Sequence, residues 1–394
     1  MWYIEEEERV YLDYNATTPL DNSVENAILE SMKYWANPSS NNPFGGHPSE
    51  KADHTLASGK KAKEVVEAAR EYVANMMHVS PKEVFFTSGG TESNWWVIYS
   101  AVEHFKAVCG REGKPHIITS SIEHPSILEP LRSLHEKGEL EHTEIGVDPE
   151  TGRVRVDEIE VALCERTVLV SVMLANNETG VIQPLAQIAE VARIAGERFN
   201  SRVWLHTDAA QAVGKVEVDP NVLKVDVITV VGHNTENTPM IAGLGAACQI
   251  VAERLHQIAE HMRDVRDYFE NQLKIALSDA VVIHFSNSER IPNTSSVSFI
   301  KYPRNAEDLL SKCKSFIAST GAACHAGTNS PSAVLCACGI PDEVASRTVR
   351  FSFGKESSRA QVDRVVNELK SIVFLGKYGS SLLSAINKGP IPGF

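Results

Sequence analysis

The stretch TVLVSVMLANNETGVIQPLAQIAEVARIAGERFNSRVWLHTDAAQ, residues 167–211, decides the fold. It begins with a short apolar run rich in β-branched residues, continues with a helical pattern and ends on a second apolar run. Such runs, separated by helices, are typical of parallel strands that helices cover on both faces. We therefore expect an α/β fold in which polar residues gather where the strands end.

Three further apolar runs extend this alternation: VFFTS (84–88), HIITS (116–120) and VDVITVVGH (225–233). From about Gln249 the pattern changes to a long helical stretch followed by shorter strand-like pieces, which indicates a second, smaller α+β domain. The boundaries we expect are an N-terminal segment (1–30) that packs on the small domain, a large domain (31–250), the small domain (251–376) and a loose tail (377–394).

Composition narrows the class of protein. The 394 residues carry 51 acidic and 38 Lys or Arg side chains, a net charge of −13 that disfavours a nucleic-acid groove. No apolar run is long enough to cross a bilayer, and the four glutamates at residues 5–8 oppose a targeting signal, so we expect a cytoplasmic protein. Seven cysteines make a disulfide framework improbable, and the Cys336–Cys338 pair lacks the second ligand pair of a zinc site, so no metal is expected.

The motif GGTESN at residues 89–94 follows an apolar run and precedes a helical pattern. Glycines and a hydroxyl at a helix N-terminus leave backbone N–H groups free to bind an anion, such as a phosphate. A tight turn with Thr91 as the helix cap explains the same residues. Taken alone, the motif leaves both interpretations open.

Three more motifs follow apolar runs. EHPS places His124 beyond one run, where an imidazole can stack on a flat ligand or move protons, although a lone histidine is more often an ordinary residue. NNETG places Asn177 at the next strand end, as a hydrogen-bond donor or a turn residue. DAAQ begins with Asp208, a carboxylate that needs a cationic partner if it is buried and that is otherwise a helix cap.

In this order the motifs resemble those of the selenocysteine lyase and cysteine desulfurase family, class V aminotransferase-like enzymes of fold type I that use pyridoxal 5'-phosphate (PLP). LDYNATTPL (12–20), NPSS (37–40), TENTPMIAGLG (235–245) and GAACH (321–325) extend the resemblance over most of the chain, to about Phe353. The resemblance implies that the large domain binds PLP. The cofactor-binding residues that it implies are Gly90, Thr91, His124, Asn177, Asp208, Gln211, His233 and Thr235.

The resemblance also implies a role for each of these residues. The Thr91 region and His233 bind the phosphate, and Thr235 reaches the phosphate held in the partner subunit, so a homodimer is expected. His124 stacks on the ring and Asp208 pairs with the ring nitrogen.

On the phenolate side, the resemblance gives Asn177 the contact with the oxygen and Gln211 a supporting role. Arg350, in RFSFG, matches the arginine that clamps the substrate carboxylate, and its planar fork suits that task. Cys324 matches the reactive cysteine on the family's loop. Cys324 and His124 are therefore the expected catalytic residues, and the substrate is an amino acid, selenocysteine or cysteine.

The chain departs from the family directly after VGH. There the family has a lysine that binds PLP covalently, followed by a further segment with a strand, whereas here Asn234 leads at once into TENTP. Neither Lys215 nor Lys224 matches the lysine's position. Loss of the segment would also expose a sheet edge. Three explanations stay open: a spliced or mis-assembled form of an active lyase, a pseudoenzyme, and an active enzyme with an unrecognised lysine.

The expected function is that of a selenocysteine lyase, which converts L-selenocysteine to L-alanine and reduced selenium. Cysteine desulfurase is the alternative within the family, and a catalytically inactive scaffold is the alternative outside it. The matches at MLANNETG, TENTPMIAGLG and GAACH favour the lyase.

Overall fold

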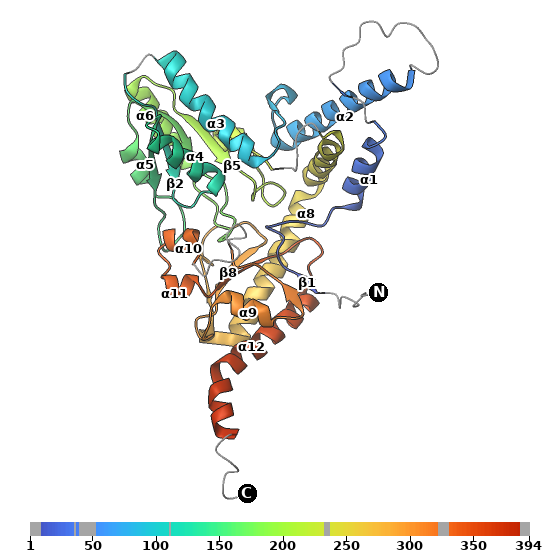
Figure 1. Cartoon of the computed structure of the whole chain (residues 1–394), viewed down its shortest axis with the longest axis vertical. Coiled ribbons are helices and arrows are strands. Elements are labelled where there is room, and N and C mark those ends of the chain that lie inside the picture. Colours follow the sequence, from blue (N-terminus) through green and yellow to red (C-terminus); the bar gives the residue numbers. More distant parts are fainter. Residues whose placement is uncertain are drawn as a thin grey trace, which may run out of the picture.

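The structure is a computed structural model that describes residues 9–34, 37–38, 53–109, 112–231, 237–321 and 331–386. Its central sheet has the strand order β3-β2-β4-β5-β6, and every pairing within it is parallel. Figure 1 labels β2 and β5 of this sheet. The strands are β2 (His116–Ser120), β3 (Glu141–Ile145), β4 (Thr167–Ser171), β5 (Trp204–Asp208) and β6 (Val227–Thr229). The expected α/β fold with a mainly parallel sheet is confirmed.

Helices cover both faces of this sheet, as its uninterrupted apolar strands predict. Successive residues of a strand point to opposite faces, so Ile117 packs with residues of α3 and α4, whereas Ile118 packs with residues of α5 and α6. The helices are α3 (Gly90–His104), α4 (Pro125–Glu136), α5 (Val156–Ala162), α6 (Leu185–Phe199) and the short α7 (Pro220–Leu223). Because the strands run parallel, the polar residues that follow β2, β4 and β5 lie at one edge of the sheet.

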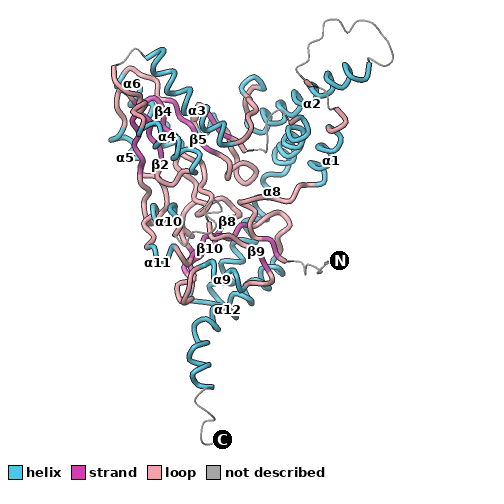
Figure 2. The backbone as a smooth tube through the Cα atoms, in the orientation of Figure 1, coloured by secondary structure: helices cyan, strands magenta, loops and turns pink. Residues whose placement is uncertain are grey.

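A second sheet is antiparallel, with the order β10-β8-β7, and the parallel pair β1-β9 accompanies it. Figure 2 labels β8, β9 and β10 in this part of the molecule. Phe269, Phe299 and Phe351 are fully buried in its core. The elements of this part are β1 (Val10–Tyr11), β7 (Val282–Ile283), β8 (Thr294–Ser298), β9 (Phe316–Ile317), β10 (Thr348–Ser352), α9 (Ala306–Lys312), α10 (Ala333–Ala337), α11 (Asp342–Ala345) and α12 (Arg359–Ile386). The N-terminal strand thus pairs within the part of the molecule that the last third of the chain builds.

The 40-residue helix α8 (Thr238–Leu277) connects the two parts (Figure 1). Near its start it packs against α1 (Asn22–Ser31) and α2 (Asp53–Met77) so closely that a Cβ on Gly245 would lie 2.8 Å from the Ala69 backbone. Near its end, Glu270 accepts two hydrogen bonds from Arg290, and both side chains are buried. The shorter elements η1 (Pro81–Glu83), η2 (Phe105–Cys109) and η3 (Ser278–Ala280) complete the described part.

The expected strand at residues 84–88 does not form. The stretch follows η1 and pairs with no strand of the described part, and β6 is the last strand on that side of the sheet. A strand needs a neighbour for its backbone hydrogen bonds, and this stretch has none among the described strands. A groove of about 750 Å³ lies here, with Phe86, Ile228 and Ile241 among its lining residues. The segment predicted to be missing after His233 stays a prediction, because residues 232–236 lie outside the described residues.

The C-terminal end also differs from expectation. α12 continues through Ile386, so the first ten residues of the expected tail, 377–386, are helical, and the remainder lies outside the described residues. None of the helices in the described ranges combines the length and the apolar character that a membrane span requires.

Candidate active site

Asp208 is the last residue of β5, and its side chain is only 8% exposed. Its Oδ2 accepts a hydrogen bond from Asn94 Nδ2 (2.9 Å), and its Oδ1 accepts one from the backbone N–H of Ala210 (3.0 Å). Both donors are neutral, and no cationic side chain of the described residues pairs with this carboxylate. Burial of an unpaired charge is unfavourable, so the geometry suits a ligand that brings its own positive charge.

His124 caps the N-terminus of α4, where its Nδ1 accepts the backbone N–H of Ser126 (3.2 Å). The Oγ of Ser126 lies 2.8 Å from the same Nδ1 and accepts a hydrogen bond from Asn94 Nδ2 (2.9 Å). Asp208, Asn94, Ser126 and His124 therefore form one network, which we call the carboxylate network. It joins residues 94, 124, 126 and 208, from three different elements, at the ends of β2 and β5. Sequence reasoning gave no role to Asn94 or Ser126, although both lie inside quoted motifs.

The N-terminus of α3 lies beside this network. Gly90 packs so tightly that an added Cβ would come within 2.7 Å of the Val231 side chain. The preceding residue, Gly89, offers no side-chain cap, so backbone N–H groups of the first turn remain for an anion. Thr91 in that turn is exposed. These features fit the phosphate site predicted from the sequence, which stays a prediction.

A second network lies on the other side of the strand ends. Gln211 donates from Nε2 to the backbone oxygen of Asn15 (3.1 Å), and Lys215 donates from Nζ to Asn15 Oδ1 (2.7 Å) and Gln211 Oε1 (2.9 Å). Burial lowers the pKa of Lys215 from its ordinary 10.5 to about 7, and the positive charge of Arg350 adds to this shift. Lys215 is the group at this site that sequence reasoning examined and set aside.

Arg350 comes from β10 and is 4% exposed. It donates from Nη2 to Asp13 Oδ1 (2.7 Å) and from Nη1 to the backbone oxygen of Asn177 (3.1 Å), while its Nε has no hydrogen-bond partner within the described ranges. Asn15 Nδ2 donates to the same oxygen of Asn177 (3.2 Å). We call Asp13, Asn15, Asn177, Gln211, Lys215 and Arg350 the arginine network. The charge partner Asp13 was missed, although it lies in the quoted LDYNATTPL.

Glu123 immediately precedes His124 of the carboxylate network and is 2% exposed. Its Oε1 accepts hydrogen bonds from the Ser120 hydroxyl and from the backbone N–H of Met173 (2.9 Å), whereas Oε2 has no partner among the described atoms. Burial raises the pKa of Glu123 to about 8, and the negative charge of Asp208 contributes to the increase. This acid is therefore mainly protonated at neutral pH, which leaves Asp208 as the negative charge of this network.

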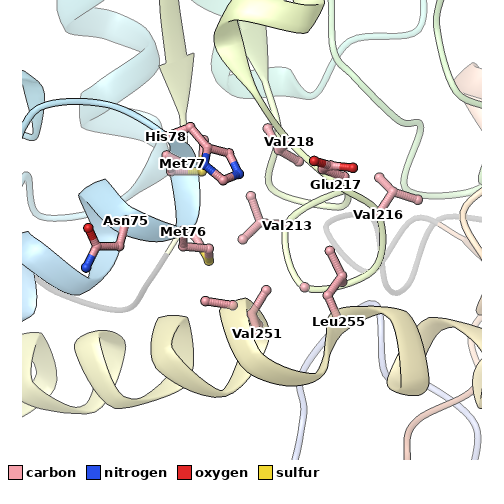
Figure 3. A pocket seen from close by; sticks show the side chains of 12 residues that line it. Asn75, Met76, Met77, His78, Val213, Val216, Glu217, Val218, Val251 and Leu255 are labelled. Atoms are coloured by element: carbon pink, nitrogen blue, oxygen red, sulfur yellow. The ribbon is translucent and has the colours of Figure 1, made fainter.

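The structure thus brings together His124 and Asp208 in one network, and Asn177, Gln211 and Arg350 in the other, with Gly90 and Thr91 at the nearby helix start. His233, Thr235 and Cys324 lie outside the described residues, as does Asn234. Within the described ranges, no group of His, Cys, Asp and Glu side chains is arranged to hold a metal ion. A small cavity of about 160 Å³ between α2, residues 213–218 and α8 is lined by none of the predicted site residues (Figure 3).

Comparisons with known proteins define the class. Residues 10–235 and 233–365 match the model of the aminotransferase class-V family, in two pieces that meet just after the VGH motif. The chain therefore belongs to the aminotransferase class-V family. Within it, the chain is 39% identical to the selenocysteine lyase of Bos taurus, an alignment that covers 93% of this chain and 94% of that protein.

Other relatives agree with this placement. The chain is 32% identical to the cysteine desulfurase IscS of Acinetobacter baumannii (strain AYE), with 92% of each protein covered. A solved structure described as a NifS-like protein superposes with a TM-score of 0.78 at 29% identity and covers 93% of this chain. The fold is thus that of the NifS-like enzymes, which confirms the fold-type I expectation, and both the lyase and the desulfurase resemblance are borne out.

Proposed function

We propose that this chain carries the PLP site of a selenocysteine lyase, which converts L-selenocysteine to L-alanine and reduced selenium. The observation that carries the proposal is Asp208, a buried carboxylate held by two neutral donors and by no cation of the described part. A protonated pyridine nitrogen is a cation of suitable shape, and it would satisfy this carboxylate. The 39% identity to selenocysteine lyase supports the choice of substrate.

The residues present fit PLP. Backbone N–H groups at Gly90 and Thr91, with His233, would hold the phosphate. His124 would lie against the ring, and Asp208 would hold a proton on the ring nitrogen. When bound, PLP withdraws electron density from the bonds at the substrate's α-carbon.

On the phenolate side of the cofactor, Asn177 and Gln211 would donate hydrogen bonds. Asn177 contacts Arg350 only through its backbone oxygen, so its amide side chain stays available for this role. Gln211 uses Nε2 on the Asn15 backbone in this structure and would have to redirect it. Thr235 would reach the phosphate bound in the partner subunit of a cytoplasmic homodimer.

Arg350 would orient the substrate carboxylate. It already donates to Asp13, so the substrate either displaces that carboxylate or uses Nε, which has no partner among the described atoms. A charged hydrogen bond to the substrate would stabilise the complex by about 1.5–3 kcal/mol. Cys324 would act at the selenium atom, where a thiolate can accept or help to discriminate the leaving chalcogen.

The absence of the family's lysine bears on activity. The aligned length with the bovine protein, 424 positions, exceeds the 394 residues of this chain, so the relative has residues with no counterpart here. The break of the family match at 233–235 supports a missing segment at Asn234. We propose that this chain corresponds to an active lyase that lacks this segment, and a catalytically silent dimer partner is the alternative.

The deciding experiment restores the segment. A protein in which the relatives' lysine-containing segment replaces Asn234 is expected to release alanine from L-selenocysteine faster than from L-cysteine. Equal rates would make it a desulfurase-like enzyme. No alanine from either substrate, in a folded protein loaded with PLP, would reject the lyase and leave a binding role. In the restored protein, Cys324→Ala is expected to change the ratio of the two rates more than it changes PLP affinity.

A further inference from the structure

Lys215 has an unusual set of partners for a lysine. Its Nζ donates to two amide oxygens, Asn15 Oδ1 at 2.7 Å and Gln211 Oε1 at 2.9 Å, and it forms no ion pair with any described carboxylate. A lysine at a protein surface usually keeps water or an acidic partner around its charge. An ammonium group held by neutral acceptors alone is poorly stabilised, so the neutral amine is favoured.

The charges around Lys215 act in the same direction. Burial, together with repulsion from the positive charge of Arg350, brings the pKa of Lys215 to about 7. Asp13 accepts a hydrogen bond from Nη2 of Arg350. Its negative charge therefore offsets the charge of Arg350 and does not stabilise a charged Lys215. At neutral pH a large share of Lys215 therefore carries a free electron pair, the state that attacks carbonyl carbons.

The position of Lys215 links it to the site. Asn15 receives the lysine on Oδ1 and donates from Nδ2 to the Asn177 oxygen that Arg350 also contacts. Gln211, four residues before the lysine, is the residue proposed to support the phenolate side. The amine thus lies within the arginine network, whereas Lys224 pairs with Glu190 on the surface.

We propose that Lys215 is a second, unassigned nucleophilic site of this protein, which condenses with the aldehyde of a pyridoxal-type ligand. This proposal rests on the proposed PLP site. In the reaction Nζ bonds to the aldehyde carbon, the carbon–oxygen bond breaks, and the oxygen leaves as water with the two protons of the neutral amine. The product is an imine, and no oxidant or reductant is needed. The sequence did not indicate this role, because Lys215 does not match the position of the family's lysine.

The first test measures the amine without any cofactor. The native protein is exposed to a trace of acetic anhydride over a range of pH, every remaining lysine is then labelled in denaturant, and peptides are analysed by mass spectrometry. The labelling rate of Lys215 is expected to rise with pH through an apparent pKa far below the usual 10.4. An apparent pKa near 10 for Lys215 would overturn the proposal.

The second test uses PLP and borohydride, which reduces an imine to a stable secondary amine. The pyridoxyl group is expected on Lys215 in the unaltered protein, to be lost in Lys215→Arg, and to be retained in Lys224→Arg. Arginine keeps the charge but does not form the imine. Mapping in the unaltered protein decides the matter even if a variant fails to fold.

The outcomes separate the two proposals. PLP that binds in an Asp208-dependent way but labels another lysine, or none, overturns the role of Lys215 and leaves the PLP site standing. A Lys215 that is reactive in the first test and takes up free pyridoxal, in a protein that shows no saturable PLP binding, supports the nucleophilic site and rejects the proposed function.

Discussion

The carboxylate network and the arginine network hold their central charges in opposite ways. Asp208 is buried among neutral donors, whereas Arg350, which is also buried, has Asp13 as a partner at 2.7 Å. A charge without a counterion weakens the fold and gains most from a ligand of opposite sign, while a paired charge supports the fold and must exchange partners to bind. The difference indicates that the carboxylate network is built for a resident cation and the arginine network for a transient anion.

The variant expected to show this difference most strongly is Asp208→Asn. Loss of a buried charge partner costs about 3–5 kcal/mol, so PLP affinity is expected to fall by at least about a hundredfold. The free energy of unfolding is expected to fall by no more than about 1 kcal/mol, because the amide keeps an acceptor and removes an unpaired charge. Fluorescence titration with PLP and urea unfolding measure the two quantities.

The control for Asp208→Asn is Asp219→Asn, the N-cap of α7, which lies outside both networks. It is expected to leave PLP affinity unchanged. If Asp208→Asn binds PLP as tightly as this control does, Asp208 has no role opposite a ligand cation.

The arginine network should respond in the reverse way. Asp13→Asn removes the charge partner of Arg350, and the free energy of unfolding is expected to fall by about 1.5–3 kcal/mol, the range for hydrogen bonds to charged groups. PLP affinity is expected to change much less than in Asp208→Asn. Urea unfolding of Asp13→Asn, Arg350→Met and the double variant forms the cycle that isolates the pair. Strictly additive losses would show that the two side chains do not stabilise each other.

Much of this arrangement could be predicted from sequence, and the reason is the parallel sheet. HIITS and VWLHTD form β2 and β5 as expected, and parallel strands bring the motifs that follow them to one edge, so His124 and Asp208 fall into one network. The apolar pattern of each run and the order of the motifs were enough to predict this placement, because both can be read from the sequence alone.

What sequence did not predict depends on neighbours. VFFTS has the composition of a strand but lies beside no strand of the described part, and composition does not reveal a missing partner. The link from Asp13 to Arg350 joins residues 337 positions apart. The shifted pKa of Lys215 arises from burial and from Arg350, neither of which its local sequence contains. Conversely, the helix through Ile386 formed despite weak periodicity.

The pH dependence of the free energy of unfolding tests whether Glu123, next to the carboxylate network, is protonated in the folded chain. The pKa of Glu123 is raised by burial from 4.5 to about 8, so the folded chain keeps a proton that the unfolded chain has released. Its contribution is complete below about pH 4.5 and is lost as pH rises to about 8. In Glu123→Gln, the free energy of unfolding is therefore expected to fall less between pH 5 and 8 than in the unaltered protein.

Glutamine keeps the acceptor for Ser120 and Met173, so the comparison isolates the proton. Buried histidines whose pKa lies near 4, such as His206, contribute equally to both proteins and cancel in the difference. Urea unfolding of both proteins at four pH values measures this difference in the free energy of unfolding. Parallel profiles for the two proteins would mean that Glu123 is ionised in the folded chain.

The smallest expected effect on PLP affinity is that of Ser126→Ala. This variant tests whether PLP binding depends on the hydrogen bonds of the carboxylate network or on the charge of Asp208. The substitution removes the hydroxyl that joins Asn94 to His124. Asn94 keeps its bond to Asp208, and His124 keeps the backbone N–H of residue 126, so the substitution removes two neutral hydrogen bonds of about 0.5–1.5 kcal/mol each. We expect less than a tenfold change in PLP affinity and a loss of stability of about 1–3 kcal/mol, the sum for the two hydrogen bonds. A loss of affinity as large as that of Asp208→Asn would mean that the orientation of the carboxylate, rather than its charge, holds the ligand, and the contrast between the two networks would then be one of geometry.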